Sequence, residues 1–109
     1  MKLETTLLLL RKDDQILLAM KKRRFGVGKY NGVGGKLQES ETPEMAMLRE
    51  TKEEINVVPT KYEKDVKGEK TNLIFHLYIA IEWEGTPNES EEMKPQWFSI
   101  SDIPYDSMF

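Results

Sequence analysis

The sequence of 109 residues contains no cysteine. This excludes disulfide bonds, zinc sites built from thiolates and a thiol nucleophile, and it is compatible with a reducing compartment. No apolar run reaches the roughly 18 residues that a membrane span requires, because the first run, "MKLETTLLLL", ends at Arg11. The acidic Glu4 also stands where a secretory signal would be basic. We therefore expect a cytoplasmic protein with no membrane partner.

Positive charge is in the minority, with 16 lysines and arginines against 19 acidic residues and a net charge of −3. This balance argues against nucleic acid as a partner. The length and the 39% hydrophobic content are typical of one globular domain over residues 1–109. The sequence ends on the apolar Phe109, which a complete domain would rarely leave uncovered, so we expect this domain to be incomplete at its C-terminal end.

Apolar, β-branched and aromatic runs predict four strands, at 3–10, 15–20, 71–85 and 95–100. The first two flank "RKDD", which predicts a hairpin with a four-residue loop. Five glycines in 21–35 predict a loop with a short extended piece around 30–33. The polar segment 86–94 is expected to connect the last two strands.

One helix is predicted at 43–55. Thr42 is a good N-cap, Pro43 fits the first helical position, and Asn56 suits a left-handed C-terminal cap. Its expected buried stripe consists of Leu48, Thr51 and Ile55, flanked by Ala46 and Met47. The predicted fold class is α+β: a mixed sheet of four or more strands with this helix packed on it.

Three glutamates of this helix, Glu50, Glu53 and Glu54, fall within an arc of about 100° on one face. Like charges at this spacing destabilise a helix, and the dipole at its C-terminal half also disfavours them. A solvated acidic face is one explanation. The other is a hard divalent cation such as Mg²⁺, which binds carboxylate oxygens and completes its shell with water and substrate phosphates.

The spacing around these glutamates favours the cation. Gly35, five residues, Glu41 and seven residues precede the run Arg49-Glu50-Thr51-Lys52-Glu53-Glu54-Ile55-Asn56-Val57. This resembles the Nudix box, G-x5-E-x7-R-E-U-x-E-E-x-G-U, where U is a bulky aliphatic residue, and seven of the nine specified positions match. Thr51 replaces an aliphatic residue and Asn56 replaces a glycine, so both departures spare the charged positions.

The resemblance to the Nudix hydrolases implies their fold and a pyrophosphohydrolase activity. It implies that Glu50, Glu53 and Glu54 bind Mg²⁺ (or Mn²⁺) and that either Glu53 or Glu54 doubles as the general base, of which we favour Glu53. Arg49 would orient Glu50 or Glu53 by charge-assisted hydrogen bonds, and Glu41 would brace the loop or Arg49. The C-terminal helix that covers the other sheet face in this family is missing from the sequence.

The stretches "MKKRRFGVGKYNGVGGKLQESET", "GTPNESEEMKPQWF" and "DIPYDSMF" resemble the MutT-type Nudix enzymes of the 8-oxo-dGTP diphosphatase type. These hydrolyse oxidised purine nucleoside triphosphates to the monophosphate and pyrophosphate, which sanitises the nucleotide pool and so serves DNA repair. The implied substrate-binding residues are Thr6, Phe25, Asn31 and Phe109 around the base, and Lys21, Val33, Gly34, Gly35 and Lys36 near the sugar and phosphates. Gly34, through its carbonyl, and Glu92 are implied as further metal ligands.

Several of these positions have structural alternatives. Asn31 before Gly32 is equally typical of a turn, Thr6 is typical of an ordinary strand residue, and Glu92 of a solvated loop. Two functional alternatives also remain open: a Nudix enzyme for another nucleoside diphosphate derivative, and a catalytically silent nucleotide-binding module. We expect the chain to act as a monomer.

Overall fold

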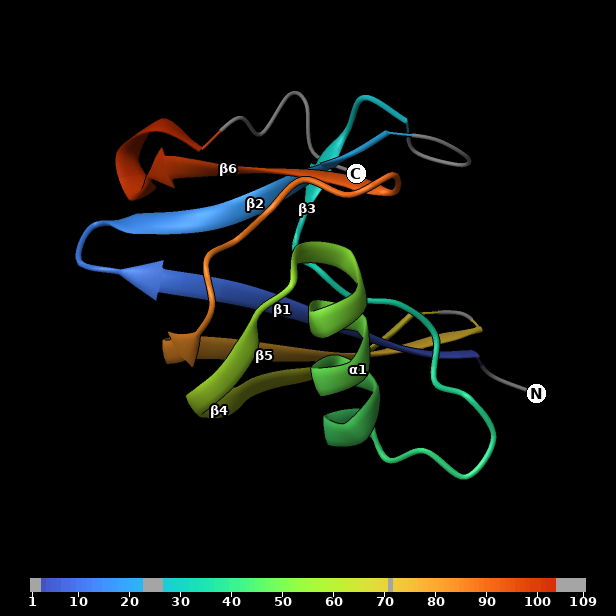
Figure 1. The fold of residues 1–109 in the computed structure, drawn as a ribbon. Coiled ribbons are helices and arrows are strands. Elements are labelled where there is room, and N and C mark those ends of the chain that lie inside the picture. The colour runs from blue at the N-terminus through green and yellow to red at the C-terminus, as the bar shows by residue number, and fades with distance from the viewer. Residues whose placement is uncertain (1–2, 23–26, 71, 104–109) are drawn as a thin grey trace.

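The computed structural model describes residues 3–22, 27–70 and 72–103, and within them six strands form one sheet that carries one α-helix (Figure 1). The strands are β1 (Leu3–Lys12), β2 (Gln15–Lys21), β3 (Tyr30–Asn31), β4 (Val58–Lys70), β5 (Leu73–Glu84) and β6 (Met93–Ser99); the helix is α1 (Pro43–Ile55), and a 3-10 turn, η1 (Ile100–Asp102), follows β6. The predicted α+β class and the bounds of the helix are confirmed. No helix among these residues is long and apolar enough to cross a membrane.

The strand order is β3-β2-β1-β5-β4, and β6 pairs with β2. β1 and β5 are parallel, whereas the other strand pairs are antiparallel. β1 and β2 pair over only three residue pairs next to their turn and then diverge. The segment that follows β3 enters this gap, where Val33 pairs with Leu8 and Lys36 pairs with Thr5. The divergence of the hairpin therefore brings the glycine-rich segment against β1, beneath the helix.

One sequence-based expectation about the strands is wrong, and one strand is missing from the prediction. The hairpin loop is not four residues long, because β1 and β2 continue to a two-residue turn at Asp13 and Asp14. Asp13 adopts a left-handed φ of 55°, which aspartate tolerates in tight turns. Strand β4 was not predicted, because its highly charged sequence lacks a strand pattern. β4 is an edge strand, and charged residues are common there because they discourage pairing with other chains.

Local caps explain why the helix begins and ends where it does. The Thr42 hydroxyl accepts a hydrogen bond from the Met45 N–H at 3.1 Å, Pro43 occupies the first position, and Asn56 closes the helix at a φ of 60°. The expected buried stripe needs correction. The buried helix residues are Ala46, Met47, Thr51, Glu54 and Ile55, whereas Leu48 is only partly buried.

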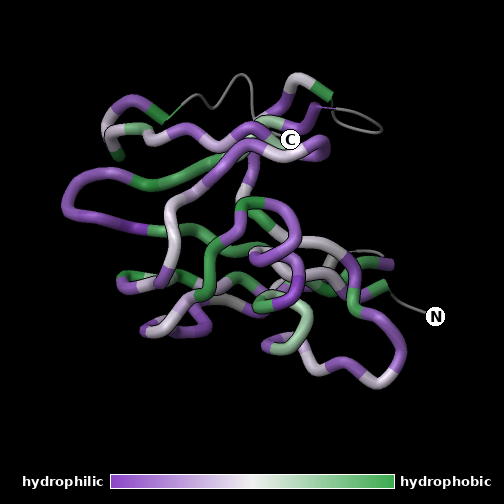
Figure 2. The backbone as a smooth tube through the Cα atoms, viewed as in Figure 1, coloured by the Kyte–Doolittle hydropathy of each residue, from purple (hydrophilic) through white to green (hydrophobic). Residues whose placement is uncertain are grey.

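The core lies between the helix and the sheet. Leu8 and Leu10 of β1 pack there with Met47 and Ile55 of the helix. Figure 2 shows hydrophobic colour along the strands beneath α1 and hydrophilic colour at the β1–β2 turn. Thr51 is fully buried in this core, and its hydroxyl donates to the Met47 carbonyl at 2.7 Å. This internal hydrogen bond explains how a polar residue replaces the aliphatic one of the motif.

Candidate active site

The glycine-rich segment lies in close contact with β1 on one side and with the helix on the other. The Thr6 N–H donates to the Gly35 carbonyl at 2.9 Å. A Cβ atom at Gly34 would come within 1.8 Å of the Thr6 carbonyl oxygen, and one at Gly35 within 2.7 Å of the Glu50 carboxyl carbon. Neither glycine has a positive φ, so it is the lack of a side chain that these positions require.

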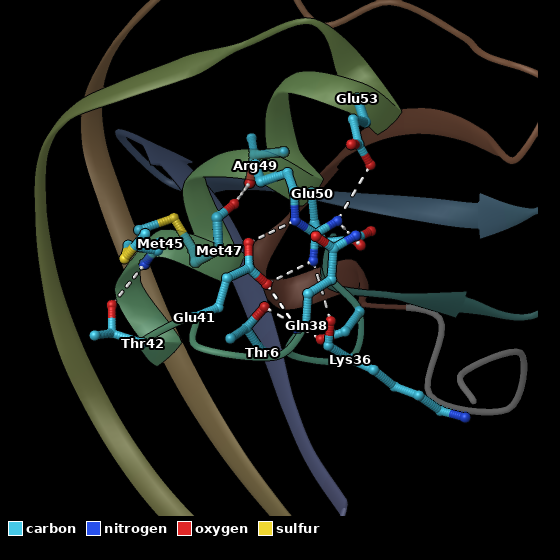
Figure 3. Close-up of polar contacts among 12 residues, drawn as sticks. Thr6, Lys36, Gln38, Glu41, Thr42, Met45, Met47, Arg49, Glu50 and Glu53 are labelled. Carbon is cyan, nitrogen blue, oxygen red and sulfur yellow. Dashed lines mark hydrogen bonds and ion pairs between the residues drawn. The ribbon is translucent and has the colours of Figure 1, made fainter.

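Arg49 is the centre of the polar network between this segment and the helix (Figure 3). Its guanidinium donates twice to Glu41, at 2.6 and 2.9 Å, and also to Glu50 at 2.5 Å, Glu53 at 3.3 Å and the Lys36 carbonyl at 3.1 Å. These charge-assisted bonds raise the pKa of Arg49. Arg49 thus contacts both glutamates that the sequence analysis expected it to orient.

The Glu41 carboxylate binds both the loop before the helix and the Arg49 guanidinium. Besides its two bonds from Arg49, its carboxylate accepts the Gln38 N–H at 2.7 Å. The bonds from Arg49, followed by the one from Gln38, lower the pKa of Glu41. The carboxylate therefore stays charged and ties the segment before the helix to Arg49.

Glu54 and Glu50 form a pair of neighbouring carboxyl groups. Glu54 is only 7% exposed, and its Oε1 has no hydrogen-bond partner among the described residues. Burial, together with the neighbouring Glu50 carboxylate, raises the pKa of Glu54 to about 8. Lys21 and the Gly34 N–H act in the opposite direction but do not prevent this. A buried carboxyl group with an unpartnered oxygen, beside a second and partly buried carboxylate, fits a hard divalent cation.

Glu53 lies differently from the other two glutamates. Its side chain is 58% exposed, and its recorded contact is the 3.3 Å bond from Arg49. In the described ranges, no three acidic or histidine side chains stand close enough together to enclose a metal ion. The structure therefore brings two of the three expected metal ligands together, while the third points outward.

Of the remaining polar candidates, Lys21 lies near this pair of carboxyl groups. Lys21 is half-buried at the end of β2, and its charge acts on Glu54. The Glu92 carbonyl accepts the Lys22 N–H at 2.9 Å, so the chain after the 85–91 loop adjoins the end of β2. Asn31 lies in strand β3, where it pairs with Ala19, and not in a turn; its amide oxygen accepts the Gly32 N–H at 2.8 Å.

The other candidates for substrate binding differ in how accessible their side chains are. Thr6 and Val33 are fully buried, and both backbone groups of Val33 bond to Leu8. In this structure these two residues position the glycine-rich segment, and their side chains do not face an open pocket. Lys36 is exposed. The predictions for Phe25 and Phe109 fall outside the described residues.

The sequence analysis missed a polar network around the buried His76, whose two partners are exposed. His76 is 3% exposed and pairs in register with Thr6. Its Nδ1 lies 2.6 Å from the Lys64 ammonium, and its Nε2 lies 3.0 Å from Glu4. A charged lysine can only donate, so Nδ1 accepts and Nε2–H donates to Glu4. The pairing of the strands brings these three residues together, and no residue spacing in the sequence predicts their contact.

The NUDIX domain model matches residues 2–108. The chain therefore belongs to the NUDIX domain family, whose hydrolases generally require a divalent metal. It is 44% identical over 110 residues to the oxidized purine nucleoside triphosphate hydrolase of Danio rerio, covering 95% of this chain and 70% of that protein. The mouse (Mus musculus) protein of the same name is 42% identical, covering 92% and 68%.

Solved structures agree with this assignment. A MutT NUDIX hydrolase from Burkholderia pseudomallei superimposes with a TM-score of 0.87 at 23% identity, covering 95% of this chain and 88% of that one. MutT from Aliivibrio salmonicida and Vibrio cholerae gives 0.86 at 22% identity, covering 100% and 88%. At these identities the likeness concerns the fold, and the predicted Nudix fold is confirmed.

The contact between Gly35 and Glu50 can be tested by a double-mutant cycle. We expect Gly35→Ala to lower the free energy of unfolding by about 1–3 kcal/mol, because the new methyl group displaces the Glu50 carboxylate. In a Glu50→Ala background the same change should cost clearly less. Gly34→Ala is the control, since its methyl group meets the Thr6 backbone and should cost the same in both backgrounds. Equal costs of Gly35→Ala in both backgrounds would contradict the contact.

The Glu54 carboxyl should make the metal-free protein sensitive to pH. Because its folded-state pKa of about 8 exceeds its ordinary value of 4.5, its contribution to stability is complete below pH 4.5 and is lost as the pH rises to 8. We expect a loss on the order of a few kcal/mol, measured by denaturant unfolding with a chelator present. Glu54→Gln should remove this dependence and be more stable than the parent at pH 8. Glu63→Gln, on the exposed β4, should keep it, and identical profiles for parent and Glu54→Gln would refute the assignment.

Proposed function

We propose that this chain hydrolyses oxidised purine nucleoside triphosphates of the 8-oxo-dGTP type to the monophosphate and pyrophosphate, with Mg²⁺, and so sanitises the nucleotide pool. The observation that carries the proposal is the buried Glu54 carboxyl group beside Glu50, whose carboxylate Arg49 holds against the glycine-rich segment. The similarity to the zebrafish and mouse hydrolases of oxidised purine nucleoside triphosphates supports the substrate class.

The donor set fits the proposed metal ion. Glu54 offers a buried oxygen without a partner among the described residues, and Glu50 lies beside it. We propose these two as ligands, together with the Gly34 carbonyl, Glu92 and a Glu53 side chain rotated inward. When bound there, Mg²⁺ neutralises polyphosphate charge and lowers the pKa of bound water.

The protein's own groups supply positioning and proton transfer. Arg49 fixes the Glu50 carboxylate, and the two bonds that Arg49 donates to Glu41 fix the guanidinium in turn. Lys21 and Lys36 offer positive charge to the phosphates. The oxygen of a water molecule forms a bond to phosphorus. The bond between that phosphorus and the oxygen that bridges the α- and β-phosphates breaks at the same time. The proton of the water passes to Glu53. Phosphoryl transfer of this kind depends mainly on positioning and charge neutralisation.

Base recognition is assigned to Asn31. Its oxygen is engaged with the Gly32 N–H, which fixes the orientation of the amide. The amide nitrogen, which bonds to no described residue, can then donate to an acceptor on the purine edge. Thr6, Phe25 and Phe109 remain predictions for the surroundings of the base. All described site residues come from one chain, and we propose that it acts as a cytoplasmic monomer.

The activity is tested by pyrophosphate release from 8-oxo-dGTP and from dGTP in the presence of Mg²⁺. We expect kcat/KM for 8-oxo-dGTP to be at least about tenfold higher, because the site binds polar groups of the base edge. Glu53→Gln should lower kcat by about 10²- to 10⁴-fold, as expected for a general base. Glu63→Gln, on the exposed edge strand, serves as the matched control and should behave as the parent.

Each result tests a different part of the proposal. Equally slow turnover of both nucleotides would exclude the oxidised purine as the substrate, and a nucleotide sugar or dinucleoside polyphosphate would then be assayed. Full activity of Glu53→Gln would exclude it as the base. A chain that binds nucleotides but releases no pyrophosphate would be a silent binding module.

A further inference from the structure

The two tryptophans of the chain lie side by side near the end of the sheet at which β1 turns into β2. Trp83 of β5 and Trp97 of β6 stack with ring centroids 5.9 Å apart and an angle of 29° between the planes. Both are half-buried and pack with their inner faces against the core.

A cavity of about 500 Å³ opens over these rings. The β1–β2 turn lines one side, and residues 85–87 of the loop after β5 line the other. A volume of this size lies within the roughly 300–1,000 Å³ range of small-molecule sites, which typically combine aromatic walls with a few polar groups. Packing against the core explains the inner faces of the rings but not this open volume.

The charge of the cavity is negative. Lys12 is the one basic residue among its lining residues, which also include Asp13 and Asp14. The recorded bonds to these aspartates use their backbone carbonyls, which accept from Arg11 at 3.4 Å and Ile100 at 2.8 Å. The turn itself does not require the charge, since asparagine suits the same tight turn.

We propose that this cavity binds a small organic cation of the alkylated ammonium class, held over the indole rings and facing the carboxylates of the turn. Indole is the best of the aromatic rings for binding cations, and the interaction strengthens when the cation is partly desolvated. The aspartates disfavour anions, so this site is distinct from the one proposed for the polyphosphate. It provides a second binding function that does not depend on hydrolysis.

The chain reports on this site directly, because both of its tryptophans line the cavity and their fluorescence therefore follows its occupation. Choline chloride is titrated at constant ionic strength, and 3,3-dimethylbutan-1-ol serves as its neutral counterpart of the same shape. We expect a saturable change in emission with choline and none with the alcohol. No saturable change with choline, or an equal response to the alcohol, would overturn the proposal.

The charge requirement is tested by the double variant Asp13→Asn and Asp14→Asn, which keeps residues that suit the turn. Choline binding should weaken by about fivefold or more, which corresponds to the loss of roughly 1 kcal/mol of attraction. The matched control, Glu63→Gln with Asp65→Asn on β4, removes the same charge elsewhere and should bind as the parent does. Circular dichroism checks the fold of each variant, and the two indole N–H resonances give a second readout. Unchanged binding in the folded turn variant would overturn the proposal.

The experiment also separates this site from the catalytic one. Glu53→Gln should bind choline with the affinity of the parent, because its change lies outside the cavity. A loss of choline binding in Glu53→Gln would mean that the fluorescence change reports the catalytic site and not the cavity, and would overturn the proposal.

Discussion

The organisation of the candidate active site depends on the Arg49 guanidinium. It bonds to Glu41 and the Lys36 carbonyl on the segment before the helix, and to Glu50 and Glu53 on the helix itself. A planar group with five donors can hold several acceptors in fixed directions, whereas a lysine ammonium could not. The caps of α1 and the small size of Gly35 serve the same purpose, because they set the distance between the two segments.

This arrangement places adverse electrostatics where the chemistry is expected. Glu54 is buried beside Glu50 in the last turns of a helix, where its dipole also disfavours negative charge. Burial and the neighbouring Glu50 carboxylate raise the pKa of Glu54, and a bound divalent cation would offset both effects. If these carboxyl groups bind a metal ion as proposed, the metal-free protein is less stable so that the metal ion binds more tightly, as expected where function and stability compete. The buried core beneath the helix, including Leu8, Met47 and Ile55, provides the compensating stability.

The sequence predicted best what local interactions decide. The bounds of α1 follow from Thr42, Pro43 and Asn56, which act within one turn of the helix. Strand β4 could not be predicted, because it is a charged edge strand that exists through its pairing with β5. The helical wheel placed Glu53 and Glu54 on one face, but packing buries Glu54 and leaves Glu53 exposed. Side-chain burial of this kind depends on which segments cover the helix, and a single sequence does not contain that information directly.

The loop between β5 and β6 relates the two sites in space. At its start, Gly85 has a φ of 93° and lies so close to the Asn56 carbonyl that a Cβ atom would approach to 2.7 Å. The Asn88 N–H then bonds to the Ile55 carbonyl, at the end of the helix that carries the carboxylates. The same loop thus lines the tryptophan cavity and bonds to the end of the helix that carries the proposed metal ligands. The two proposed ligands differ in charge accordingly: the aspartates of the β1–β2 turn would favour a cation in the cavity, and Lys21 would favour a phosphate at the candidate active site.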